Sequence, residues 1–196
     1  MIALILRKFR PVRDNTEQQD IARKWCEKYL VSYEECISKL GFKSINKEVF
    51  PMDYVKEVER KLTISKSDFG GQGHVVLIYA VCENLKAVKV LETGVAYGWS
   101  SAAILQSISK RSGKLISVDM PMLKQTDYHL IGAAVDENLK SKWELLREPD
   151  RYGLNKAIKR QNYSFDLAHY DSDKSYYGRK WSQSLIWKYL RKGGVF

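Results

Sequence analysis

A short apolar run that ends in a glycine-rich turn constrains the fold of this chain more than any other feature. Residues 88–93 have the length and composition of a buried strand, and Gly94 and Gly98 follow them closely. Residues 100–109 then show an apolar helical pattern. A strand that turns through glycines into a helix is typical of βαβ units, so the sequence predicts parallel strands joined by crossover helices.

The strand pattern recurs four more times, with helical patterns between the strands. The segments are residues 114–119, 143–146, 165–170 and 194–196, the last as the beginning of a fifth strand. This alternation predicts an α/β, Rossmann-like sheet covered by helices on both faces. We expect this domain to occupy residues 66–196 and, because the sequence stops within the fifth strand, to lack its C-terminal part.

The N-terminal third has helical rather than alternating patterns. Thr16 and Ser32 each begin a capping signature that precedes a helical pattern, and Pro51 stands where the first turn of a third helix tolerates proline. We therefore expect residues 1–65 to form an N-terminal helical extension. It either packs on the main domain as a helical layer or serves as a lid or a contact in a homo-oligomer.

The chain is basic, with 33 Lys and Arg against 23 Asp and Glu and a formal net charge of +10. A basic balance invites a nucleic-acid partner or another anion-facing patch. However, the basic residues are interleaved with acidic ones along the sequence, and no run of pure basic residues exceeds two. This distribution favours a solvated surface over a dedicated nucleic-acid arm, and leaves the anion-facing patch as the alternative.

The cysteines and the hydropathy indicate the compartment. Cys26, Cys36 and Cys82 are odd in number and lack the C-x-x-C spacing, which favours reduced thiols over a disulfide framework or a zinc site. No stretch has the roughly 18 consecutive apolar residues that a membrane span needs. We therefore expect a cytoplasmic protein without a membrane segment.

Candidate ligand-binding residues gather around the glycine turn. Open α/β sheets bind ligands at the carboxyl ends of their strands, where Glu92, Gly94, Gly98 and Asp119 are expected. An acid at the end of the second strand, as at Asp119, accepts hydrogen bonds from ribose hydroxyls in nucleotide-binding domains. The dinucleotide pattern G-x-G-x-x-G is poorly matched, because Ala96 stands at its second glycine.

Together these motifs resemble those of class I S-adenosylmethionine-dependent methyltransferases. The first is Glu92-x-Gly94-x-Ala96-x-Gly98, and the second is Ser117-Val118-Asp119. Residues 169–176 and 190–196 are similar to the fourth strand and the following turn of small-molecule O-methyltransferases. The subgroup resembled most includes caffeoyl-CoA-type and macrocin or rhamnosyl O-methyltransferase-like enzymes, and the likeness covers residues 69–196.

The resemblance implies which residues would bind S-adenosyl-L-methionine. Gly94, Ala96 and Gly98 would wrap its methionine part, with Glu92 supporting the loop. Asp119 would hold the ribose and Met120 would lie against the adenine. The full implied set is Glu92, Gly94, Ala96, Tyr97, Gly98, Ser100, Ser101, Asp119 and Met120, in which Tyr97 covers the cofactor or fills the core and the two serines offer hydroxyls or amides at the helix start.

The resemblance also implies catalytic residues. Asp171 would orient or deprotonate the acceptor, and in metal-dependent relatives the matching aspartate is a ligand of Mg²⁺ or another divalent cation. Such an ion would lower the pKa of a substrate hydroxyl. Lys174 either acts near the substrate, or is a surface charge or a member of a structural ion pair.

The function expected from the sequence is methyl transfer to a hydroxyl oxygen of a small molecule. Methylation of RNA is an alternative suggested by the charge, although Asp171-Ser172-Asp173-Lys174 lacks the proline-rich motif of base-amino methyltransferases. A catalytically silent S-adenosylmethionine-binding module is a further alternative. The mismatched glycine pattern disfavours a nicotinamide-dependent oxidoreductase.

Overall fold

The computed structural model describes residues 16–45, 48–65, 69–121 and 127–196. The chain divides into two compact units, Met1–Cys36 and Ile37–Phe196. The first unit contains α2 (Thr16–Tyr29) and the start of α3 (Tyr33–Lys39). Residues 1–15 of the predicted N-terminal extension lie outside the described residues.

The first two of the three predicted N-terminal helices are confirmed by α2 and α3. The N–H of Glu35 donates to Oγ of Ser32 over 3.1 Å, which is the cap that the sequence indicates at the start of α3. On α2, the rings of Trp25 and Tyr29 lie with centroids 4.8 Å apart and are more than half exposed. The helical spacing in this segment therefore produces an exposed aromatic pair on α2.

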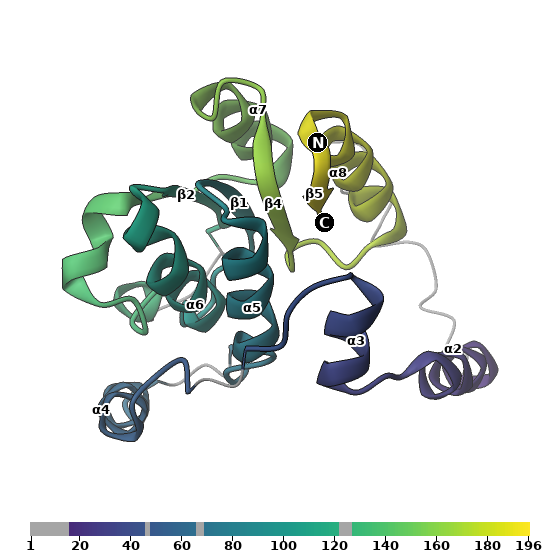
Figure 1. The fold of residues 1–196 in the computed structure, drawn as a ribbon, viewed down its shortest axis with the longest axis horizontal. Helices are drawn as coiled ribbons and strands as arrows, with labels where there is room; N and C mark the ends of the chain where they lie inside the picture. The colour runs from purple at the N-terminus through teal and green to yellow at the C-terminus, as the bar shows by residue number, and fades with distance from the viewer. Residues whose placement is uncertain (1–15, 46–47, 66–68, 122–126) are drawn as a thin grey trace. The chain divides into compact units, whose positions relative to one another are not determined.

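The second unit is built on a five-stranded parallel sheet with the order β3-β2-β1-β4-β5 (Figure 1). The strands are β1 (Lys89–Thr93), β2 (Lys114–Val118), β3 (Trp143–Leu146), β4 (Phe165–Tyr170) and β5 (Leu190–Val195). The chain reverses its direction of travel across the sheet between β3 and β4, so a topological switch point lies where β1 and β4 adjoin. The predicted Rossmann-like fold is confirmed.

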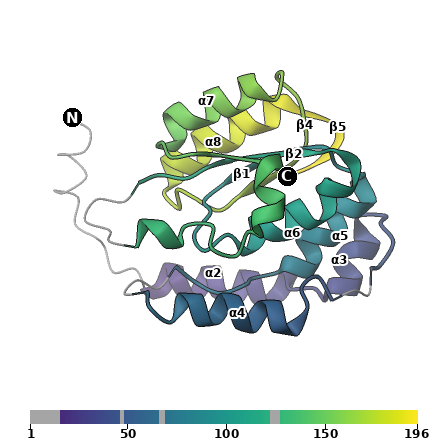
Figure 2. The same cartoon turned by 90° about the vertical axis from the view of Figure 1, so that its left-hand side faces the viewer.

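Helices cover both faces of the sheet, with α5 and α6 on one side and α7 and α8 on the other (Figure 2). The helices of this unit are α4 (Met52–Leu62), α5 (Val75–Leu85), α6 (Trp99–Ile108), α7 (Asp150–Arg160) and α8 (Tyr176–Tyr189), and the 3₁₀ turns are η1 (Ser109–Arg111), η2 (Tyr128–Leu130) and η3 (Glu137–Lys142). None of the helices within the described residues combines the length and apolarity needed to cross a membrane.

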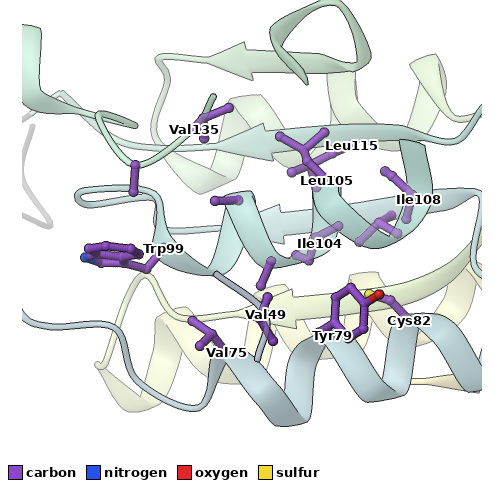
Figure 3. Close-up of a cluster of buried hydrophobic side chains, with 14 of the residues drawn as sticks. Val49, Val75, Tyr79, Cys82, Trp99, Ile104, Leu105, Ile108, Leu115 and Val135 are labelled. Carbon is purple, nitrogen blue, oxygen red and sulfur yellow. The ribbon is translucent and has the colours of Figure 1, made fainter. Parts of the chain in front are cut away.

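Alternate residues of the central strands enter two separate cores. Val90 and Leu115 are fully buried in the core that contains α5 and α6, where Ile104 and Tyr79 also lie (Figure 3). Their strand neighbours Leu91 and Ile116 belong instead to the core beneath α7 and α8. Burial on both faces explains why these strands appear in the sequence as nearly continuous apolar runs.

The core beneath α5 and α6 also includes residues from before position 65. Val49, Phe50 and Val58 are buried in it, and the rings of Phe50 and Trp99 lie with centroids 5.6 Å apart. A domain boundary at residues 65 and 66 stays a prediction.

The fifth strand begins earlier than the sequence indicates. We expected it at Gly194, but β5 starts at Leu190, which pairs with Phe165 of β4 directly after α8 ends. The register then shifts before Leu167 pairs with Val195, and Gly193 takes a positive φ of 74°. Basic residues and glycines in an irregular, partly exposed strand conceal its beginning, because the apolar pattern of a strand is missing there.

The contact between α7 and β2 gives a test of the packing. A Cβ on Gly153 would lie 2.4 Å from Cγ1 of Val118. Gly153→Ala should therefore lower the free energy of unfolding by about 1–3 kcal/mol through overpacking, despite the roughly 1 kcal/mol that alanine gains in a helix. The measurement is urea unfolding monitored by circular dichroism.

Two companion variants sharpen this test. Val118→Ala removes the clashing methyls, so the double variant should be less destabilised than the sum of its parts. Gly71→Ala, where no atom lies within 4 Å of the added Cβ, should stay within about 0.5 kcal/mol of the parent. Strict additivity of Gly153→Ala and Val118→Ala would contradict the packing described here.

Candidate active site

The turn between β1 and α6 stands at the carboxyl edge of the sheet, beside the switch point. Gly94, Ala96 and Gly98 all have positive φ values, of 78°, 50° and 85°. Gly98 forms the N-cap of α6 in the left-handed region, and its N–H donates to the carbonyl of Val95 over 2.8 Å. Two of these three alternate positions are glycine, which adopts a positive φ without strain, and the third is an alanine in a strained conformation. The turn places the N-terminus of α6 at this edge.

Glu92 lies beneath this turn, and its side chain is fully buried. Hydroxyls of three serines donate to its carboxylate: Ser100 to Oε1 over 2.7 Å, and Ser101 and Ser117 to Oε2 over 2.5 and 2.7 Å. Nδ1 of His169 lies 3.5 Å from Oε1 and makes no well-formed hydrogen bond to any residue that the structure describes. Glu92 thus connects β1 to β2, α6 and β4.

The carboxylate of Glu92 stays charged despite its burial. Burial alone would raise its pKa, but attraction to His169 and the hydrogen bonds from Ser101 and Ser100 outweigh that effect, and the pKa lies below its usual range. The hydroxyls of Ser100 and Ser101 point to this carboxylate. Whether these serines also contact a cofactor stays a prediction.

Asp119 follows β2 and is held from two sides. Its Oδ1 accepts from the N–H of Val95 over 2.9 Å, and its Oδ2 pairs with Nη1 of Arg147. Arg147 directly follows β3, and its guanidinium lies 5.7 Å from the ring centroid of Tyr128. Met120, the next residue after Asp119, has an exposed side chain. Asp119 and Met120 therefore stand at the edge that the sequence predicts for them.

Asp171 reaches the same edge from the end of β4. Its N–H donates to the carbonyl of Thr93 over 2.8 Å, and an added Cβ on Gly94 would lie 2.5 Å from its backbone oxygen. The Asp171 carboxylate pairs with Nζ of Lys174, and both side chains are more than half exposed. The structure therefore brings the two predicted catalytic residues into contact with each other, beside the glycine turn.

The remaining predicted residue, Tyr97, lies in the core. Its side chain is 6% exposed, its hydroxyl donates to Oγ of Ser65 over 3.1 Å, and its ring meets Phe69 edge-on at 5.0 Å. Of the two roles predicted for this tyrosine, core filling is the one that these contacts describe.

Sequence reasoning missed a second layer of polar residues at this edge. Ser172 Oγ lies 2.5 Å from Oδ2 of Asp150 and 3.0 Å from Oγ1 of Thr93. Burial raises the pKa of Asp150, and the charges of Asp173 and Asp119 raise it further. Asp150 begins α7, and its position shortly after an expected strand was the one sequence signal that could have indicated it. Arg147 could have been found by the same rule.

The described residues include no group of three histidine, cysteine or acidic side chains arranged to hold a metal ion. Asp171 is paired with an ammonium group instead, so the ligand set at this place fits a divalent cation poorly.

The parallel sheet order and the turn at its switch point define a Rossmann-like methyltransferase fold. A family model described as a methyltransferase domain matches residues 91–196, more than half of the sequence. The chain therefore belongs to this methyltransferase-domain family. No curated protein sequence matches the chain.

Solved structures share the fold at low sequence identity. A methyltransferase from Podospora anserina bound to SAH (S-adenosylhomocysteine) is 17% identical with a TM-score of 0.56, over 95% of this chain and 71% of its own. An O-methyltransferase from Bacillus cereus in complex with SAH is 20% identical with a TM-score of 0.50, over 77% of this chain and 66% of its own. A cofactor-bound protein from MTB is 14% identical with a TM-score of 0.55, over 74% and 64%. The chain thus spans about two thirds of the length of these structures.

The buried carboxylate beneath the turn can be tested by its pH dependence. Glu92→Gln should lower the free energy of unfolding at pH 7 by about 1–3 kcal/mol, because one serine hydroxyl then faces an amide donor. The lowered pKa means that charged Glu92 stabilises the fold above its pKa and loses this effect as the pH falls through it. The gap between parent and variant should therefore narrow below about pH 4.

The measurement is urea unfolding at pH values from 7 to 3, for the parent and the variant. Glu59→Gln, a change at an exposed residue of α4, serves as the matched control and should follow the parent across the whole series. A gap between parent and Glu92→Gln that is constant with pH would show that the buried charge does not stabilise the fold.

Proposed function

We propose that the chain binds S-adenosyl-L-methionine at the carboxyl edge of the sheet and transfers its methyl group to a hydroxyl oxygen of a small molecule. The observation that carries this proposal is the placement of Asp119 and Asp171 on either side of the β1–α6 turn. The N–H of Val95 in the turn donates to Asp119, and Gly94 of the same turn packs against the backbone of Asp171.

The residues at this edge fit the nucleoside part of the cofactor. A carboxylate offers about four acceptor positions, and the side chain of Asp119 uses one toward Val95 and one toward Arg147. The remaining positions can accept from the two hydroxyls of a ribose. Met120 supplies an exposed, polarizable side chain suited to the face of an adenine. That relatives of the same fold were solved with SAH supports this assignment.

The reaction needs alignment and the removal of one proton. The cofactor, when bound, supplies a methyl group that is already activated as a sulfonium. The chain must therefore hold an acceptor oxygen in line with that methyl and exclude other orientations, which is the larger part of such catalysis. Asp171, exposed beside the turn, is placed to accept the proton of the acceptor hydroxyl. Lys174, which pairs with it, would orient the carboxylate.

A direct role for Asp171 is favoured over a metal-mediated one by the side chains around it. The described residues offer no further carboxylate grouping for a cation there, and Lys174 already neutralises Asp171. Oxygen as the acceptor atom is supported by the O-methyltransferase from Bacillus cereus among the similar folds.

Cofactor binding is tested at Asp119. Isothermal titration calorimetry should show that S-adenosylhomocysteine binds the parent chain and that NAD does not. Asp119→Ala should weaken S-adenosylhomocysteine by about 1–3 kcal/mol, roughly 5- to 150-fold in Kd, because the ribose loses its acceptor. Glu137→Ala, which removes an equally negative but exposed side chain, should leave the Kd unchanged. A Kd for Asp119→Ala within twofold of the parent would contradict the assignment.

Catalysis is tested at Asp171 with a panel of catechol and sugar hydroxyl acceptors. Asp171→Asn should lower kcat by about 10²- to 10⁴-fold, as expected for loss of a general base, and EDTA should have no effect on the parent. Asp53→Asn, in an exposed position of α4, is the control and should retain activity.

The two treatments separate the possible roles of Asp171. Activity that falls with both the substitution and EDTA would make Asp171 a metal ligand. Activity indifferent to both would remove it from the mechanism.

A further inference from the structure

A basic depression opens beside Asp171, at the start of α8. It has a volume of about 600 Å³ and is lined by Lys174, Tyr176, Arg179, Lys180, Gln183 and Ser184. Three of these side chains are cationic, two are neutral hydrogen-bonding groups and one is aromatic. Among the described residues, no acidic side chain lines it.

Two of the three cations of this depression have no anionic partner within the described residues, while the third, Lys174, pairs with Asp171. In the described part of the chain, neither Arg179 nor Lys180 forms an ion pair, and Nζ of Lys180 lies 5.9 Å from the ring centroid of Tyr176. Burial, together with the charge of Arg179, lowers the pKa of Lys174, so the positive charges already crowd one another. An anion bound among them would relieve this repulsion.

The depression continues from the proposed reaction centre. Lys174 lines it and pairs with Asp171, whose N–H is bonded to the end of β1. One side chain therefore separates the depression from the residue proposed to take the acceptor's proton. A molecule lying here could present a hydroxyl to Asp171 while another part of it occupies the depression.

The charge distribution favours a compact anion over an extended polyanion. On the neighbouring helix α7, Lys156 pairs with Glu148 and Arg160 pairs with Glu144, so part of its positive charge is neutralised. Arg179 and Lys180, which form no ion pair among the described residues, both line the depression, where Arg179 can offer two parallel N–H donors to one phosphate or carboxylate. Tyr176 adds an aromatic wall for an attached ring.

We propose that this depression is a subsite for an anionic group, a phosphate or carboxylate, carried by the methyl acceptor. The acceptor class is then a hydroxyl compound that also bears such a group. This inference rests on the proposed function, because it assigns the depression to the acceptor of that reaction.

The test uses phenyl phosphate and phenol as a matched anionic and neutral pair. Their binding is followed by NMR of the ¹⁵N-labelled full chain, with and without S-adenosylhomocysteine. Phenyl phosphate should bind the parent at least about tenfold more tightly than phenol, and the double variant Arg179→Gln/Lys180→Gln should remove that preference. The control Lys188→Gln/Lys192→Gln, which removes two charges outside the depression, should change the affinity less than about twofold.

Three results would overturn the proposal. The first is equal binding of phenol and phenyl phosphate, and the second is equal loss in the two double variants. The third is an oligouridylate that binds more tightly than phenyl phosphate and whose binding is weakened as much by Lys188→Gln/Lys192→Gln as by Arg179→Gln/Lys180→Gln. That result would make the surface a nucleic-acid interface.

The S-adenosylhomocysteine titration of the same samples keeps the two proposals apart. Loss of phosphate preference with unchanged S-adenosylhomocysteine affinity in Arg179→Gln/Lys180→Gln supports the subsite. A parent chain that binds phenyl phosphate but not S-adenosylhomocysteine contradicts the proposed function and, with it, the assignment of the anion to a methyl acceptor. Normal S-adenosylhomocysteine binding without any phosphate preference overturns the subsite alone.

Discussion

The buried charge of Glu92 is the constraint on which the candidate site depends. A carboxylate without water must be satisfied by donors, and here they come from Ser117 on β2 and from Ser100 and Ser101 on the first turn of α6. Because these elements are fixed to one acceptor, the turn between β1 and α6 has little freedom to move. The position of the proposed cofactor turn is therefore set from inside the protein, before any ligand arrives.

The same edge shows how a parallel sheet collects polar groups from distant parts of the sequence. Asp119 follows β2, Arg147 follows β3 and Asp171 follows β4. Asp119 accepts from the turn after β1, Arg147 pairs with Asp119, and the N–H of Asp171 donates to the last residue of β1. Arg147 carries a second consequence for ligand binding. Within the described residues its Nη2 is buried without a hydrogen-bond partner, so a nucleoside bound at Asp119 as proposed would meet a further donor there.

The sequence predicts the sheet well because its strands are buried on both faces, which makes the apolar runs at Leu91 and Ile116 distinct. The position of Asp119 could also be predicted, because it comes directly after one of these apolar runs. Other features depend on three-dimensional contacts that no local pattern records. The serine hydroxyls could not be assigned to Glu92 from spacing, and the pairing of Arg147 with Asp119 joins two loops. The start of β5 at Leu190 was hidden by its irregular register.

The turn also packs closely against a second glycine, Gly132, which in turn packs against Trp143. An added Cβ on Gly98 would lie 2.7 Å from Cα of Gly132, and one on Gly132 would lie 2.3 Å from the ring of Trp143. The backbone of Gly98 therefore contacts the backbone of Gly132, and Gly132 contacts the indole of Trp143 at the start of β3. A side chain added at Gly98 or Gly132 could not be accommodated by a change of rotamer in the other residue, because glycine has no side-chain torsion. The distance between the β1–α6 turn and Gly132 is therefore fixed by backbone packing. Any change in the shape of the proposed cofactor site must come from the side chains around it.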